Sequence, residues 1–233
     1  MPESSPSISN VLAEAPQNWG RWGPEDEIGA LNYLDTGQAA RGARAVRSGK
    51  TFALGLDILR PGGDPSIGIR GQAKKFMSCD KGFFENGHLP PMPGGLEYSD
   101  DFIAMYLQGS TQVDALGHVW FDDQLYNGYD AHTTTGGLKK CSIKPIADHG
   151  IVGHGVLLDV ARAKGVSHLA ANEQVTLADL HETASRQGVA IERRDILLIR
   201  TGWITVFYEQ GGDSMTGRGE PGITDEPALI SWF

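Results

Sequence analysis

The chain has 233 residues, of which 40% are apolar, and its formal net charge is −9. This balance argues against nucleic acid and anionic membranes as partners, because both select clustered Lys and Arg, and the sequence has no long basic run. The sequence shows no apolar stretch of membrane-spanning length, no secretory signal pattern and no cysteine framework. These properties predict a cytoplasmic protein, and the length allows one sizeable core or at most two small ones. The expected partner is a small-molecule substrate.

The N-terminal residues divide into a lead and an aromatic turn. Residues 1–17 predict a flexible lead, and a single domain is expected over residues 18–233. Trp19 and Trp22 stand among Gly and Pro, and this spacing predicts a turn whose rings pack on the protein's own body or on a neighbouring subunit.

Three segments follow before the central part of the chain. Asp35 and Thr36 predict the start of a helix that continues to about residue 48. Apolar alternation over residues 51–58 predicts a half-buried strand. Residues 60–100 are rich in Gly and Pro and predict long loops.

A polar stretch follows the apolar residues 102–107, which predict a buried strand. Strand ends often carry the chemistry of α/β proteins. Gln112 and Asp114 face the same way on an extended backbone, and His118 can approach Asp114 if the chain then coils. A carboxylate, an imidazole and amide oxygens can hold a metal ion or run acid–base chemistry. The simpler alternative, in which Asp114 caps a turn and His118 makes a structural hydrogen bond, stays open.

Aromatic side chains follow His118. Trp120, Phe121 and Tyr126 are expected to line a pocket beside it, which favours a flat or ring-bearing substrate. Tyr126 also begins a Tyr-Asn-Gly sequence that predicts a tight turn, and the loop after it is expected to expose His132.

The remaining elements indicate an α/β domain. Residues 155–160 and 195–200 predict two buried strands, and residues 176–187 predict a helix that starts with a capping box. Residues 203–210 predict a short helix. From Pro227 the sequence predicts a helix whose apolar face has no partner within the chain, as in an N-terminal portion of a longer protein.

The stretch Gln108-Gly109-Ser110-Thr111-Gln112-Val113-Asp114-Ala115-Leu116-Gly117-His118 resembles the signature His-x-Gly-Thr-His-x-Asp-x-Pro-x-His of the putative cyclase family. That family includes metal-dependent bacterial kynurenine formamidases, isatin hydrolase and trans-dienelactone hydrolase. Thr111, Asp114 and His118 match the signature, whereas Gln108 and Gln112 stand where the family has ligand histidines. Residues 155–159 and 195–203 resemble the family's second and third strands, and residues 19–24 resemble a subfamily with a longer N-terminus.

The resemblance implies a swivelling β/β/α fold, a homodimer or homotetramer, and arylformamidase-like hydrolysis. A divalent metal, Mn or Zn, would activate water against a cyclic or aryl amide, imide or lactone. Asp114, Gln112 and Gln108 would be its ligands, and His118 would move the proton. Gln amide oxygens favour harder ions such as Mn over Zn. The resemblance places two further family ligands, a His and a Glu, beyond residue 233.

The residues around the stretch are also expected to bind the substrate. These are the polar Gln108 and Thr111 and the aromatic Trp120, Phe121 and Tyr126. Two alternatives remain open. One is a metal-free lactonase, dehydratase or cyclase that uses Asp114 and His118 as an acid–base pair. The other is a non-catalytic family member that has lost its ligand histidines.

Overall fold

The computed structural model describes residues 9, 12, 15–60, 63–65, 70–109, 111–211 and 219–233. The chain forms two compact units. Unit 1 comprises Met1–Phe52, Val113–Trp203 and Gly219–Phe233, and unit 2 comprises Ala53–Gln112 and Ile204–Arg218. Most of the predicted flexible lead lies outside the described residues. Within them, no helix combines the length and the apolar character needed to cross a membrane.

Unit 1 mixes helices with short parallel strand pairs. Its helices are α2 (Thr36–Ala45), α4 (Ile143–His149), α5 (Val160–Ala163), α6 (Leu177–Gln187) and α8 (Pro227–Trp232). Its 3-10 helices are η1 (Gly29–Tyr33), η3 (Tyr126–Gly128) and η4 (Ala131–Thr134). Its strands are β3 (Gly155–Asp159), β4 (Gln174–Val175), β5 (Ile196–Arg200) and β6 (Gly222–Ile223). This mixture confirms the α/β class predicted from the sequence.

The parallel pair of β3 and β5 carries the main core of unit 1. Val156 and Leu158 are buried on one face of β3, while Leu157 on the other face is half exposed. The two predicted strands are therefore confirmed, but the prediction that they are buried holds for one face of β3 only. The core consists of Val156, Leu158, Val160, Ala161, Leu169, Val175, Leu180, Ala184 and Leu229.

Helix α6 forms as its capping pattern predicts. The Thr176 hydroxyl accepts the backbone N–H of Asp179, and the Asp179 carboxylate accepts the backbone N–H of Thr176. Gly188 ends the helix with a φ of 65°, a conformation that glycine adopts without a steric penalty. Local side-chain chemistry thus fixes both ends of this helix.

Helix α2 is held to the start of β5 by a buried carboxylate. Its cap, Asp35, is confirmed, but the helix ends at Ala45 and not near residue 48. Arg41 donates to the Asp195 carboxylate at 2.6 Å, and His154 Nδ1 lies 2.8 Å from the same oxygen. Burial raises the pKa of Asp195, but hydrogen bonds from the Glu192 backbone, His154 and Arg41 outweigh it, so the pKa is lowered.

The C-terminal helix α8 has partners within the chain. Leu229 is 1% exposed and lies in the core with Val175 and Leu180. The prediction that the apolar face of this helix lacks partners is therefore wrong. The physical reason is that β6 pairs with β4, just before α6, and the Glu226 carboxylate accepts the Leu177 N–H at 2.6 Å.

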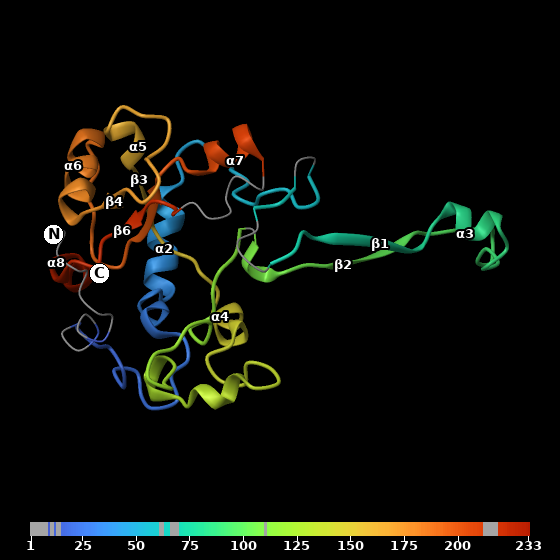
Figure 1. Ribbon diagram of the computed structural model, residues 1–233, viewed down its shortest axis with the longest axis horizontal. Helices are drawn as coiled ribbons and strands as arrows, with labels where there is room; N and C mark the ends of the chain where they lie inside the picture. The colour runs from blue at the N-terminus through green and yellow to red at the C-terminus, as the bar shows by residue number, and fades with distance from the viewer. Residues whose placement is uncertain are drawn as a thin grey trace. The chain divides into compact units, whose positions relative to one another are not determined.

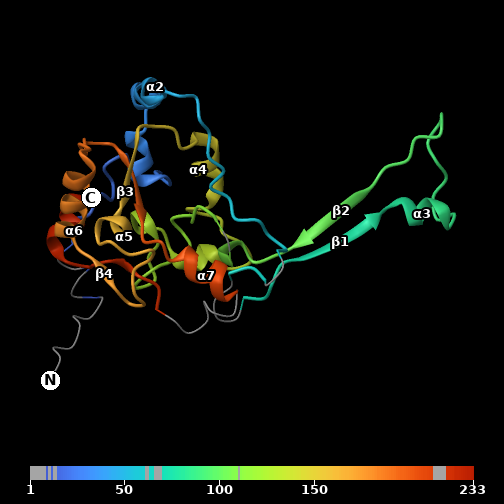
Figure 2. The same cartoon turned by 90° about the horizontal axis from the view of Figure 1, so that it is seen from above.

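Unit 2 contains an antiparallel ribbon of β1 (Lys74–Cys79) and β2 (Asp100–Ala104), with α3 (Lys81–Glu85) following β1 (Figures 1 and 2). Unit 2 also contains the 3-10 helix η2 (Leu107–Gly109) and helix α7 (Ile204–Gln210), which confirms the helix expected over residues 203–210. The prediction of loops throughout residues 60–100 is wrong at β1 and α3. Strand β1 forms because its backbone pairs with β2, far along the chain, and the Phe76 and Phe102 rings stack 5.1 Å apart across the pair.

Two strand predictions in unit 2 need correction. The apolar run over residues 102–107 is not one buried strand: β2 ends at Ala104, and Phe102 is 55% exposed in a sheet of only two strands. Residues 51–58 do not form a strand. The backbone of this segment is instead held by the Thr111 side chain. The Thr111 hydroxyl accepts the Leu56 N–H at 3.1 Å and donates to the Leu54 carbonyl. One hydroxyl replaces the ladder that a strand would need.

Candidate functional site

The residues of the predicted site are divided between the two units. Asp114 and His118 belong to unit 1, whereas Gln108, Thr111 and Gln112 belong to unit 2. Ser110 lies outside the described residues. The turn that carries Asp114 and His118 can therefore be described within unit 1. The convergence of all five side chains stays a prediction.

The predicted tightening of the backbone before His118 is confirmed. The His118 N–H donates to the Ala115 carbonyl at 2.9 Å, and the Gly117 N–H donates to the Cys141 carbonyl at 2.9 Å. Gly117 is buried, and a Cβ there would lie 2.7 Å from Leu138 Cδ1. A larger residue at this position would require the Leu138 side chain to move and the Lys140 and Cys141 carbonyls, 3.1 Å from that Cβ, to shift. The turn leaves His118 partly buried and Asp114 exposed.

The aromatic residues after His118 differ in exposure to solvent: Trp120 and Phe121 are exposed, whereas Tyr126 is partly buried. Trp120 is 52% and Phe121 is 43% exposed. Phe121 and Gln124 bond to each other across a tight turn in which Asp122 and Asp123 both have positive φ. A two-residue turn of this kind favours Asn-Gly, and carboxylate residues there carry a steric cost.

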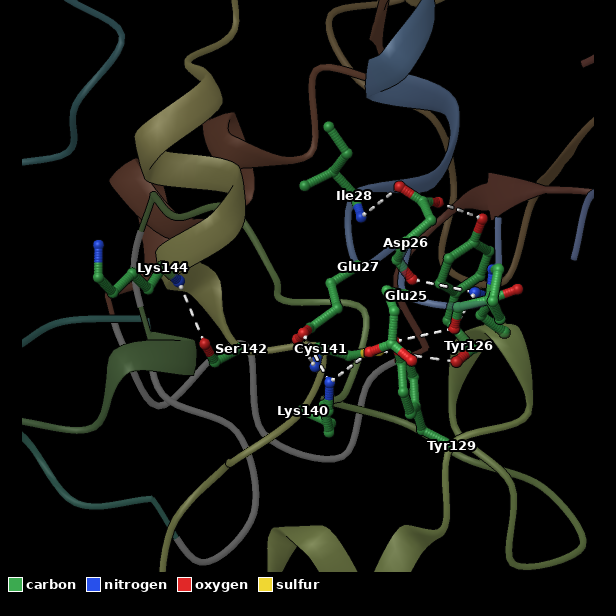
Figure 3. Close-up of polar contacts among 12 residues, drawn as sticks. Glu25, Asp26, Glu27, Ile28, Tyr126, Tyr129, Lys140, Cys141, Ser142 and Lys144 are labelled. Atoms are coloured by element: carbon green, nitrogen blue, oxygen red, sulfur yellow. Dashed lines mark hydrogen bonds and ion pairs between the residues drawn. The ribbon is translucent and has the colours of Figure 1, made fainter. Parts of the chain in front are cut away.

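Tyr126 is partly buried and is tied to the N-terminal segment, as Figure 3 shows. Its hydroxyl donates to the Asp26 carboxylate at 2.8 Å. The same carboxylate accepts the Asn32 amide at 2.7 Å and the Gly29 N–H at 3.0 Å. Burial alone would raise the pKa of Asp26, but the hydrogen bonds from these donors have the larger combined effect, so the pKa is lowered. Burial and the neighbouring Asp26 both raise the pKa of the Tyr126 phenol, so Tyr126 is a neutral donor at physiological pH.

The next acid along the chain, Glu27, contacts Lys140 and Cys141 (Figure 3). Its carboxylate accepts the Cys141 backbone N–H at 2.6 Å and lies 3.3 Å from the Lys140 ammonium. Lys140 also contacts Glu25 at 3.3 Å. Burial, with Glu27 nearby, raises the pKa of the Cys141 thiol to about 11, so Cys141 is a buried thiol and not a nucleophile at neutral pH.

The aromatic turn at the N-terminus packs as predicted. Trp22 meets the Tyr33 ring edge-on at 5.1 Å. A Cβ added to Gly128 would lie 3.8 Å from the Trp19 ring, and Gly20 N–H donates to the Asn127 side chain at 2.7 Å. The predicted tight turn beginning at Tyr126 is also confirmed, since Asn127 has a φ of 62°.

Sequence reasoning missed the supporting acids. Asp26 and Glu27 were not predicted to contact Tyr126 and Cys141, about 100 residues away along the chain. The available signal was a run of three acids at residues 25–27 directly after the Trp, Gly and Pro turn. Consecutive acids are usually solvated, so this signal could not name their partners.

The predicted site offers few ligands for a divalent ion. Within residues 15–60, 63–65, 70–109, 111–211 and 219–233, no three His, Cys, Asp or Glu side chains form a group that could hold a metal. Asp114 supplies one carboxylate, and Gln108 and Gln112 supply neutral amide oxygens. Firm binding of a divalent ion needs more negative charge than this set of side chains provides. The described residues would therefore bind a divalent ion only weakly, and they suit a hard ion such as Mn.

Comparison with known proteins gave a match to a family model and matches to solved structures. The family model described as putative cyclase matches residues 25–232. A solved structure described as a novel cyclase is 30% identical, with a TM-score of 0.81, and the match covers 93% of this chain and 72% of that one. No curated protein matched the chain.

Proposed function

Since the chain belongs to the putative cyclase family, we propose that it is a hydrolase for a cyclic or aryl amide, imide or lactone, with arylformamidase-like chemistry. The observation that carries the proposal is the turn at residues 115–118. It holds His118 partly buried on a backbone fixed at Gly117, within the region that the family model matches. An imidazole on a fixed backbone can accept a proton and donate it again.

His118 is the proposed acid–base residue. As a base it takes a proton from water while the water oxygen bonds to the substrate's carbonyl carbon. The protonated imidazole then donates that proton to the leaving nitrogen or oxygen, and the C–N or C–O bond breaks. Asp114 is proposed as the carboxylate of the site, and Gln108, Thr111, Trp120, Phe121 and Tyr126 as its substrate contacts.

A divalent ion, Mn or Zn, remains the proposed cofactor. Asp114 would hold it, with Gln112 and Gln108 as weaker ligands, and this all-oxygen set favours Mn. When bound, the ion would supply Lewis acidity to the water and the carbonyl. Because the described residues fit the ion only weakly, the steps above are assigned to His118 alone.

The swivelling β/β/α arrangement and a homodimer or homotetramer remain proposals as well. Light scattering on the purified protein measures the assembly directly.

The test is a substrate panel of N-formyl-kynurenine, isatin and lactones, each assayed with Mn, with Zn and after chelation. His118→Ala should lower kcat by about 10²- to 10⁴-fold on whichever substrate is turned over. His132→Ala is the matched control, because the His132 side chain is 82% exposed and pairs with Asp130. Equal activity of the two variants would remove His118 from the mechanism.

A metal-free reaction is the second candidate, because Gln108 and Gln112 stand where the family has ligand histidines and supply only neutral amide oxygens. Metal analysis and activity before and after chelation separate the two. In the metal-dependent case, Asp114→Ala loses both metal and activity. In the metal-free case, the stripped protein keeps its activity, and Asp114→Ala still lowers it.

A further inference from the structure

We propose that Glu27 is a positioning residue for His118 and acts through the backbone of Cys141. The proposal rests on the proposed function, in which His118 moves the proton. It assigns a role to the N-terminal acidic segment that the family signature at residues 108–118 does not include.

The first link joins Glu27 to Cys141. The Glu27 side chain is only 19% exposed, and one carboxylate oxygen accepts the Cys141 N–H at 2.6 Å. The other oxygen lies 3.3 Å from the Lys140 ammonium. A charged acceptor on a backbone donor makes a short, strong hydrogen bond. Glu27 therefore fixes the backbone of residues 140–141.

The second link joins Cys141 to Gly117. The Cys141 carbonyl accepts the Gly117 N–H at 2.9 Å. A Cβ built on Gly117 would lie 3.1 Å from the carbonyl oxygens of both Lys140 and Cys141. The two backbones are thus in close contact, and a displacement of Cys141 must displace Gly117, the residue that precedes His118.

The third link is apolar. Leu116 packs against the small core of Leu125, Ala131 and Cys141. Both central residues of the turn, Leu116 and Gly117, are therefore anchored to the segment that Glu27 holds. Catalysis by a general base depends on its position to within about 1 Å, so the loss of this anchor should affect turnover more than folding.

The test compares Glu27→Ala with Glu25→Ala. Glu25 lies two residues away and is bonded to Lys140 at 3.3 Å, as Glu27 is, but it has no described bond to Cys141. Each variant therefore removes one acid and one contact with Lys140, whereas only Glu27→Ala removes the bond to Cys141. Amide hydrogen exchange measured by NMR should show Gly117 exchanging faster in Glu27→Ala than in the wild type, by up to about 10- to 100-fold, the range that corresponds to losing the bond between Cys141 and the charged Glu27 acceptor. The Gly117 rate in Glu25→Ala and the rates in α6 should not change.

The kinetic arm uses the substrate identified by the panel. Glu27→Ala should lower kcat about 10-fold or more with KM nearly constant, and Glu27→Gln, which keeps an oxygen acceptor, should recover part of the loss. Unchanged Gly117 exchange, or equal loss of kcat in the two alanine variants, overturns the proposal. If Glu27→Ala does not fold, Glu27→Gln, whose acceptor is neutral and weaker, should show a smaller rise in Gly117 exchange and a smaller loss of kcat, and no change in either overturns the proposal. A wild type without activity removes the proposed function, while the exchange arm still tests the link between Glu27 and Gly117.

Discussion

The hydrogen bond from Tyr126 to Asp26 anchors the N-terminal segment, and its strength can be measured by Tyr126→Phe. The substitution removes one hydroxyl from a bond of 2.8 Å to a carboxylate. Bonds to charged groups contribute about 1.5–3 kcal/mol. The Asp26 carboxylate keeps the Asn32 amide and the Gly29 N–H, so it is not left unsatisfied, and we expect a loss near the lower end, about 1.5–2 kcal/mol. In a chain of this length, that corresponds to a fall in Tm of about 3–8 °C.

The assay for this prediction is urea unfolding followed by tryptophan fluorescence, because all five tryptophans lie in unit 1. Tyr129→Phe is the control. Its hydroxyl donates to the neutral Pro24 carbonyl at 3.0 Å on the exposed side, and such a bond contributes about 0.5–1 kcal/mol. The pKa of Asp26 is lowered in the folded protein, so the extra loss in Tyr126→Phe should be present above pH 3.8 and disappear as the pH falls through the folded pKa. Equal losses in the two variants at neutral pH would refute the reasoning.

Two further predictions concern the core and the buried carboxylate of unit 1. Leu229→Ala should lower the free energy of unfolding by about 2–5 kcal/mol, because Leu229 is buried in the core. Leu157→Ala, at a half-exposed position, should lower it by about 1 kcal/mol or less. Urea unfolding measures both values, and similar losses would show that α8 does not belong to the core. Asp195→Asn should destabilise the protein at neutral pH. Because the folded pKa of Asp195 is lowered, the difference from the wild type should shrink as the pH falls below 3.8, and a constant difference from about pH 6 to about pH 3 would contradict this.

Elements with local signals were predicted well from the sequence. Helix α6 carries its own start and stop, in Thr176, Asp179 and Gly188. Strands β3 and β5 are short apolar runs that need no distant information to be recognised as strands. The turn before His118 was predicted for the same reason, since its small residues allow a tight backbone.

Elements that depend on distant partners were not predicted. Strand β1 exists because it pairs with β2, and its own sequence, with two lysines and a cysteine, gives no alternation that would reveal it. The alternating residues 51–58 gave a strand signal without a strand to pair with. The apolar face of α8 seemed unpartnered because its partners, Val175 and Leu180, lie about 50 residues earlier. The supporting role of Glu27 depends in the same way on a contact across 114 residues.

The discontinuity of unit 1 has a consequence for its synthesis. Its core joins Val156 on β3 to Leu229 on α8, and the residues of unit 2 interrupt its sequence twice. A ribosome must therefore deliver the chain as far as residue 229 before this core can close. Until then, the apolar side chains of β3 and α6 that will meet Leu229 stay uncovered on the nascent chain. Such delayed closure favours capture by chaperones and aggregation during fast expression, so slower synthesis at lower temperature should raise the yield of folded protein.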